Sequence, residues 1–388
     1  MKIAIITSGI LPVPAVLGGA VENLIDFYLE YNQEHQLHDI TIYSIANENI
    51  KNPNTPYNHY HYIDTISLKS KLKRKIFQQY HSTLYYHYHI EYFLSQTLKH
   101  LKKEKYDVII LENRPGYAIP VSQASNAKII LHLHNDLLNP QTPYARNIHE
   151  CCTSIISISN YIKQCVDNIG LPSKTRTVYN GIDIKRFQHP NITITRDNLG
   201  FSYDDFIVVY SGRINQEKGV YELVQAFINL KKNISIKLLV LGGEFYGNQV
   251  KRNNFIDILN QEIKKNSLPV KLTGFISYEE IPAYLAIADI AVVPSLWEEP
   301  FALTCIEAMA SGLPLIATRS GGIPEICQNY AILLDKENII DNLTCNIDSL
   351  FHNQELRNRM IISGLKYCTQ FDKMKYSSHF FKSIQDSI

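Results

Sequence analysis

Short apolar runs alternate with amphipathic segments along the N-terminal half of the chain. The first run, residues 2–8, precedes a segment from Ala20 to about residue 33 that has apolar residues on one helical face. Further strand-like runs occupy residues 40–45, 107–111, 127–133, 153–157 and 175–179. Continuous apolar strands separated by helices are typical of a parallel sheet covered on both faces, so this half is predicted to be an α/β domain.

A second series of the same kind follows the polar stretch 190–205. Its predicted strands are 206–211, 236–241, 270–273, 290–294, 314–317 and 331–334, with helices at 219–230 and 300–311 among those between them. Because 388 residues exceed one ordinary core, two α/β domains are expected, at 1–192 and 200–370, joined by a hinge near 190–205. The helical pattern at 372–388 can return to the first domain.

Composition excludes several classes of protein. A net charge of +1 gives no general field for nucleic acid. The seven cysteines lack zinc or redox spacing and are expected to be reduced thiols of a cytoplasmic protein. The initial apolar run is a buried strand rather than a signal peptide, and no run approaches the ~18–20 residues of a membrane span. An Asp-x-Asp motif does not occur, which argues against a metal bridging phosphates.

The segment 212–219 follows a predicted strand and opens a helix. Arg213 and Lys218 would then lie near a helix N-terminus at the carboxyl edge of a parallel sheet, where α/β proteins bind ligands. Backbone N–H groups and two cations suit a diphosphate. A surface turn with solvated charges is an equally open interpretation.

The segment 295–312 carries two glutamates. Pro300 suits a first helical position and Gly312 a C-terminal cap, which puts Glu299 just before a helix and Glu307 two turns into it. Two carboxylates can accept hydrogen bonds from several sugar hydroxyls. The alternative is one capping and one solvated glutamate, but Glu307 has apolar neighbours, and a carboxylate there is costly without a partner.

Two glycine pairs follow strands, Gly18-Gly19 and Gly321-Gly322. Paired glycines allow a backbone to approach a ligand closely, although simple turns explain each pair as well. His132 and His134 end another strand and point to the same side. One functional histidine or a core histidine is expected; a zinc pair lacks an obvious third ligand, so no metal is predicted.

The segment 68–105 is compatible with a long helix and begins with five basic residues, followed by aromatic ones. It is either a docking surface for an anionic membrane, through residues 69–93, or a solvated face beside a buried aromatic one.

These motifs together resemble glycosyltransferase family 4, whose members have the GT-B fold of two Rossmann-like domains facing each other across a cleft. The resemblance extends from Gly18-Gly19 to Gly321-Gly322. Its specific parts are Glu299-Pro300-Phe301 with Glu307, which match a Glu-x7-Glu motif, and 180–183 with Phe187, which match an interdomain signature. Ala302 departs from the family, which usually has glycine there.

The resemblance implies residue roles. Arg213 and Lys218 would neutralise the donor diphosphate, Glu307 would bind the ribose, and Glu299 the donor sugar. Gly18 and Gly19 would bring backbone to the phosphates, and Phe275 and Ile276 would hold the base. His134 would lie near the reacting centre, with His132 the alternative. The donor site is completed by Phe301, Ala302 and Leu303.

The implied activity is transfer of a hexose-type sugar, with retained configuration and without a metal or other cofactor. The donor would be a UDP-sugar and the acceptor a sugar or lipid-linked glycan in polysaccharide or glycoconjugate synthesis, at the inner face of the cell membrane. Two alternatives stay open: a UDP-sugar epimerase of similar shape, and an inactive nucleotide-binding partner subunit.

Overall fold

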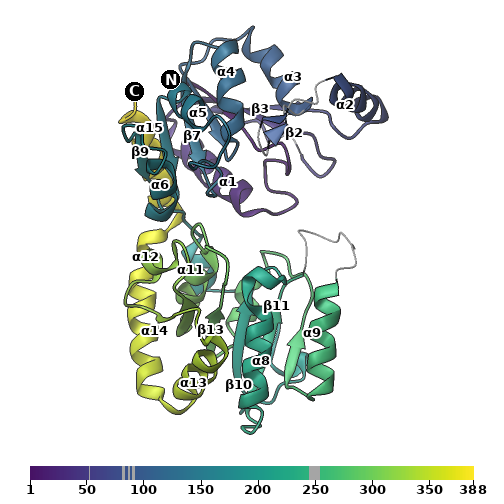
Figure 1. The fold of residues 1–388 in the computed structure, drawn as a ribbon, viewed down its shortest axis with the longest axis vertical. Helices are drawn as coiled ribbons and strands as arrows, with labels where there is room; N and C mark the ends of the chain where they lie inside the picture. Colours follow the sequence, from purple (N-terminus) through teal and green to yellow (C-terminus); the bar gives the residue numbers. More distant parts are fainter. Residues whose placement is uncertain (52, 81–83, 86–87, 90–91, 244–253) are drawn as a thin grey trace. The chain divides into compact units, whose positions relative to one another are not determined.

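The chain forms two compact units (Figure 1). The computed structural model describes residues 1–51, 53–80, 84–85, 88–89, 92–243 and 254–388. The first unit combines Met1–Gly181 with Lys373–Ile388, and the second is Ile182–Asp372. The expected boundary at 192–200 therefore lies inside the second unit. The reason is local packing, because Ile184 and Phe187 are buried there and the Phe187 ring meets Tyr278.

A seven-stranded parallel sheet forms the centre of the first unit, in the order β3-β2-β1-β6-β7-β8-β9. Strand β1 lies inside the sheet, β2 and β3 follow it to one edge, and β6 to β9 extend from its other side to the opposite edge. Strand order consequently reverses between β1 and β6. The strands are β1 (Lys2–Ile6), β2 (Asp39–Ile45), β3 (Asn58–Ile63), β6 (Val108–Glu112), β7 (Lys128–Leu133), β8 (Ser154–Ser157) and β9 (Thr175–Thr177).

Helices connect these strands and cover the sheet. They are α1 (Ala20–His35), α2 (Leu68–Tyr80), α3 (Tyr92–Leu101), α4 (Ala118–Ala124), α5 (Ala145–Cys151) and α6 (Asn160–Asp167). The expected C-terminal helix is α15 (Lys373–Gln385), which packs on α1 although it is the last element of the chain (Figure 1). The rings of Tyr28 and Phe380 stack with centroids 4.3 Å apart, and this contact ties the chain end into the first core.

The second unit has a six-stranded parallel sheet in the order β12-β11-β10-β13-β14-β15, which reverses between β10 and β13. The strands are β10 (Phe206–Ser211), β11 (Ile236–Leu241), β12 (Val270–Leu272), β13 (Ile290–Val293), β14 (Leu315–Thr318) and β15 (Ile332–Leu334). The helices are α7 (Ile184–Gln188), α8 (Val220–Leu230), α9 (Asn254–Lys265), α10 (Ile281–Leu285), α11 (Leu303–Ala310), α12 (Ile323–Cys327), α13 (Ile339–His352) and α14 (Gln354–Cys368).

Three local predictions need correction. Strand β3 was not predicted, because its sequence is polar and it pairs only at the sheet edge. The segment 68–105 is not one helix: α2 and α3 are separated by the short antiparallel pair β4 (Leu84–Tyr85) and β5 (Tyr88–His89). Helix α11 begins at Leu303, so Pro300 lies before it rather than at its first position. No helix among the described residues is long and apolar enough to cross a membrane.

Candidate functional site

The loops after β10 and β13 meet where strand order reverses in the second sheet. Such a switch point is where open α/β sheets bind ligands. The Lys218 ammonium from the first loop donates to Oε1 of Glu299 from the second, at 2.5 Å. The Ser295 hydroxyl donates to the same oxygen at 2.7 Å. Two predicted donor-site residues, 81 positions apart in the chain, are thus brought into direct contact.

Local backbone interactions hold Lys218 in place. Its N–H donates to the side-chain oxygen of Asn215 at 3.1 Å, in a short 3₁₀ turn. Gly219 follows with φ +69°, and a Cβ there would collide with the carbonyl oxygen of Pro294 at the end of β13. The N–H groups of 296 and 297 both donate to the Glu217 carbonyl at 2.9 Å. Only glycine lets these two loops approach so closely.

The Gly321-Gly322 loop supports Glu299. The N–H of Gly322 donates to the Glu299 carbonyl at 2.7 Å, and the N–H of Gly321 donates to the Glu298 carboxylate at 2.6 Å. Gly321 has φ +52°, and a Cβ would overlap the Glu299 backbone. Within the described structure, this glycine pair therefore positions a glutamate.

Glu307 lies in α11 and is 5% exposed. Burial raises its pKa to about 7, although a hydrogen bond from Tyr278 and the charge of Arg186 lower it. The Arg186 guanidinium lies 5.1 Å from the centre of the Tyr278 ring. A carboxylate in apolar surroundings needs a partner, and the partner of Glu307 is the hydroxyl of Tyr278.

Nucleotide affinity is expected to fall as pH is lowered from 8 to 6, because protonation removes the negative charge with which Glu307 would accept ribose hydroxyls. The fall should be centred near the pKa of about 7. Titration calorimetry with UDP-glucose measures it, since that ligand has no phosphate group titrating in this range. The matched variant Glu307→Gln should bind more weakly and without this pH dependence; the same slope in both proteins would assign it to another group.

The remaining predicted donor-site residues differ in exposure. Arg213 is exposed, and its carbonyl accepts a hydrogen bond from Tyr210 at 2.7 Å. Phe275 is also exposed, whereas Ile276 and Leu303 are half-buried. Phe301 is buried against Phe371 and therefore supports the loop rather than facing solvent. Ala302 has φ +66°, a conformation that costs a non-glycine residue about 1–2 kcal/mol, which explains why glycine suits this position.

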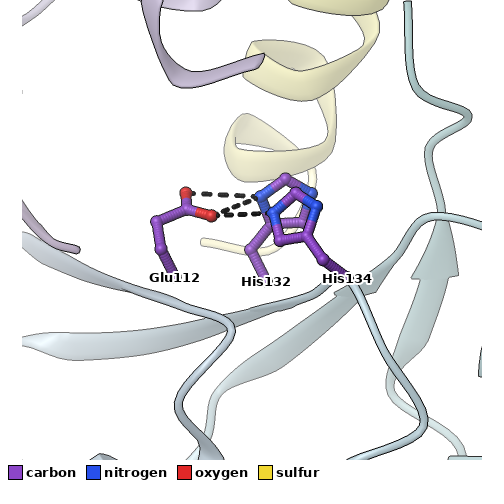
Figure 2. Close-up of side chains that lie close together, drawn as sticks. All are labelled: Glu112, His132 and His134. Atoms are coloured by element: carbon purple, nitrogen blue, oxygen red, sulfur yellow. Dashed lines mark hydrogen bonds and ion pairs between the residues drawn. The ribbon is translucent and has the colours of Figure 1, made fainter. Parts of the chain in front are cut away.

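In the first unit, the ends of β6 and β7 bring Glu112, His132 and His134 together (Figure 2). The Glu112 Oε2 atom lies 3.0 Å from His132 Nδ1 and 3.0 Å from His134 Nε2. The Tyr28 hydroxyl donates to Oε1 at 2.9 Å. Glu112 and the His132 side chain are fully buried, and the Phe380 ring lies beside His132. His134 is therefore one member of a buried cluster centred on Glu112.

Charge and protonation are coupled in this cluster. Burial alone would raise the pKa of Glu112, but the two histidines outweigh it and hold that pKa well below its usual range. Burial lowers the pKa of His134 to about 4, so this imidazole is neutral at pH 7. The neutral His134 ring donates to Glu112 from Nε2, which leaves its Nδ1 as an acceptor. Neither His134 Nδ1 nor His132 Nε2 has a partner among the described residues.

The cluster also has the composition of a metal site. Among the described residues it is the one set of three or more histidine, cysteine or carboxylate side chains with ligand atoms within 4.8 Å of one another. The third ligand absent from the sequence-based interpretation is Glu112. However, an ion bound between these atoms would leave the outer ring nitrogens as buried donors without acceptors, contrary to the usual support of metal-bound histidine. The described residues therefore lack the supporting acceptors that metal-bound histidines usually have.

The Gly18-Gly19 pair precedes α1 in the loop after β1. Gly19 has φ +111°, and a Cβ there would overlap the Glu22 carboxylate. Burial raises the pKa of Glu22 to about 7. Glu22 and Glu112 were both absent from the predicted site. Glu22 lies three residues after the Gly18-Gly19 pair and Glu112 directly follows the predicted strand 107–111, and these positions are the signals that point to them.

Comparison with known proteins follows the same division of the chain. The model of the family described as glycosyl transferases group 1 matches residues 191–367, and that of Glycosyltransferase Family 4 matches residues 52–186. The chain belongs to glycosyltransferase family 4. Among its relatives, the putative glycosyltransferase YtcC of Bacillus subtilis is 26% identical, over 100% of this chain and 92% of the relative. A lipopolysaccharide 1,2-N-acetylglucosaminetransferase of Salmonella typhimurium is 28% identical over 52% of this chain and 51% of its own.

Solved structures agree with this assignment at the level of the fold. Anabaena HepE in complex with UDP-glucose aligns over 100% of both chains with a TM-score of 0.74 and 18% identity. The protein is therefore a glycosyltransferase of the GT-B fold class, as its sequence motifs predict.

Proposed function

We propose that this glycosyltransferase moves a hexose-type sugar from a UDP-sugar to a sugar or lipid-linked glycan acceptor, with retention of configuration. The observation that carries the proposal is the contact of Lys218 with Glu299 at the switch point of the second sheet. A cation for the diphosphate and a carboxylate for sugar hydroxyls lie side by side there, as the direct bond between diphosphate and sugar in the donor requires.

The UDP-sugar donor is supported by the fold relative HepE, which binds UDP-glucose. The glycan acceptor is supported by the Salmonella relative, named for a reaction of lipopolysaccharide. Synthesis of polysaccharide or glycoconjugate from a cytoplasmic nucleotide sugar would place the protein in the cytoplasm, at the inner face of the membrane.

In the proposed reaction, an acceptor hydroxyl oxygen bonds to the anomeric carbon on the face from which the diphosphate leaves. The bond from that carbon to the phosphate oxygen breaks with both electrons, and the departing phosphate takes the acceptor proton. Lys218 and Arg213 stabilise the charge growing on the diphosphate, while Glu307 and Glu299 hold the ribose and the sugar. Catalysis is then positioning and electrostatic stabilisation by side chains, with no metal.

The donor is identified by a thermal-shift screen of uridine, guanosine, adenosine and thymidine diphosphate sugars in the presence of a chelator. A ligand at 100 times its dissociation constant adds about 2.7 kcal/mol of stability. We expect a shift with the UDP-sugars that is lost in Glu307→Ala. The anomeric signals of product and donor in NMR then report retention. An inverted product, or a shift that requires a divalent ion, would contradict the corresponding part of the proposal, and binding without turnover on any glycan acceptor would favour an inactive partner subunit.

A further inference from the structure

Helix α2 packs against the rest of the first unit through a narrow face. Ser70 is buried and Phe77, seven residues later on the same side, is half-buried. The Ser70 hydroxyl donates to Asp64 at 2.8 Å, and the Phe77 ring lies against Tyr92 of α3 at 6.3 Å. These contacts fix which side of α2 faces the domain.

The opposite side of α2 is apolar and exposed. Leu68, Leu72 and Ile76 are 86%, 62% and 48% exposed, and their spacing of four residues aligns them in one stripe. At about 100° per residue, the stripe is centred roughly 150° from the face that carries Ser70 and Phe77. An amphipathic helix on a soluble domain normally turns its apolar stripe inward, whereas α2 turns its stripe outward.

Cations surround this stripe. Five exposed basic residues lie within two turns of the helix: Lys69, Lys71, Lys73, Arg74 and Lys75. Residues 68–80 contain no aspartate or glutamate. By helical position, Lys71 and Lys75 lie on one side of the stripe, and Lys69 and Lys73 on the other. A solvated surface helix explains the cations but not the three large apolar side chains between them.

We propose that α2 docks on an anionic lipid surface, with Leu68, Leu72 and Ile76 at the boundary between headgroups and acyl chains and the lysines among the phosphates. An apolar stripe with flanking cations is the arrangement by which helices bind in the membrane interface. The proposal goes beyond the donor site, because it concerns a different surface and holds for any donor. It narrows the predicted contact 69–93 to α2; within that segment, residues 81–83, 86–87 and 90–91 lie outside the described residues.

Vesicle cosedimentation tests this docking. The protein should bind vesicles of phosphatidylcholine with phosphatidylglycerol, bind pure phosphatidylcholine far more weakly, and dissociate as salt is raised. Each basic residue near an anionic surface contributes about fivefold, so Lys71→Gln with Lys75→Gln should weaken binding by about 25-fold. Leu72→Ser with Ile76→Ser should weaken it at least about tenfold, because two apolar side chains no longer leave water.

Matched controls lie in the second unit. Lys231→Gln with Lys232→Gln changes the net charge equally, and Ile362→Ser removes an exposed apolar side chain from α14. Both controls should bind vesicles like the parent protein, and all variants should keep the thermal shift with UDP, which shows that they are folded. Equal binding to both vesicle types, or α2 variants that bind like the controls, would overturn the proposal. So would a fall in molar mass of Leu72→Ser with Ile76→Ser in light scattering, because the stripe would then join two copies of the chain.

Discussion

Replacing Lys218 by alanine is expected to lower kcat/KM for sugar transfer by about a hundred- to a thousandfold, the usual effect of removing one group that stabilises transition-state charge. The ammonium is held by its bond to Glu299, and the backbone of Lys218 is held by the Asn215 turn. Because charge on the diphosphate grows as the sugar leaves, the loss should appear mainly in kcat. Lys218→Arg should recover part of the activity, since it keeps the charge but changes the donor geometry.

A neighbouring ion pair supplies the control for Lys218. Lys336 pairs with Glu298, the residue next to Glu299, but Glu298 is half exposed. Lys336→Ala removes the same kind of cation from the loop after β15 and should leave kcat/KM within about twofold, as expected for an exposed pair. Melting curves of both variants show whether lost activity reflects unfolding. If the Lys218→Ala variant transferred sugar at the parental rate, Lys218 would have no role in binding the diphosphate.

The position of the loop that carries Lys218 could be predicted because its signals are local. A buried strand followed by a glycine and a helix places a loop at the carboxyl edge of a sheet, whatever the rest of the chain does. Strands β10 and β11 were predicted with their observed bounds, which put Lys218 at that edge. The contact with Glu299 also needs β13 beside β10, and this adjacency follows from the doubly wound order of the sheet.

The cluster around Glu112 and two other features were harder to predict because their contacts join distant parts of the chain. Glu112 gains its partners from β7 and from α1, whose Tyr28 is 84 positions earlier, and no spacing rule connects them. The unit boundary at Gly181 depends on the packing of Phe187 near Tyr278. The sequence does not show this contact, and the polar stretch 190–205 suggests a later boundary instead. The outward stripe of α2 likewise requires knowing that Ser70 and Phe77 carry the buried face.

Replacing Glu112 by alanine is expected to reduce the free energy of unfolding by about 3–5 kcal/mol, the range for removing one partner from a buried ionic cluster. The carboxylate accepts hydrogen bonds from Tyr28, His132 and His134, and all three donors are buried. Glu112→Gln keeps the volume but places an amide donor against at least one N–H, so it should be intermediate. Urea unfolding at pH 7 measures both changes.

The stability that Glu112 contributes should depend on pH in one direction. The pKa of Glu112 is lower in the folded protein than in the unfolded chain, so its stabilising contribution is complete above the unfolded value of 4.5 and is lost as pH falls below it. The difference between parent and Glu112→Gln should therefore shrink in acid. Glu104→Gln is the matched control: that glutamate forms an exposed pair with Lys2 and should change stability by less than about 1 kcal/mol. A Glu112→Gln protein as stable as the parent at pH 7 would show that the carboxylate does not hold the two histidines, and with it His134 would lose its defined orientation at the end of β7.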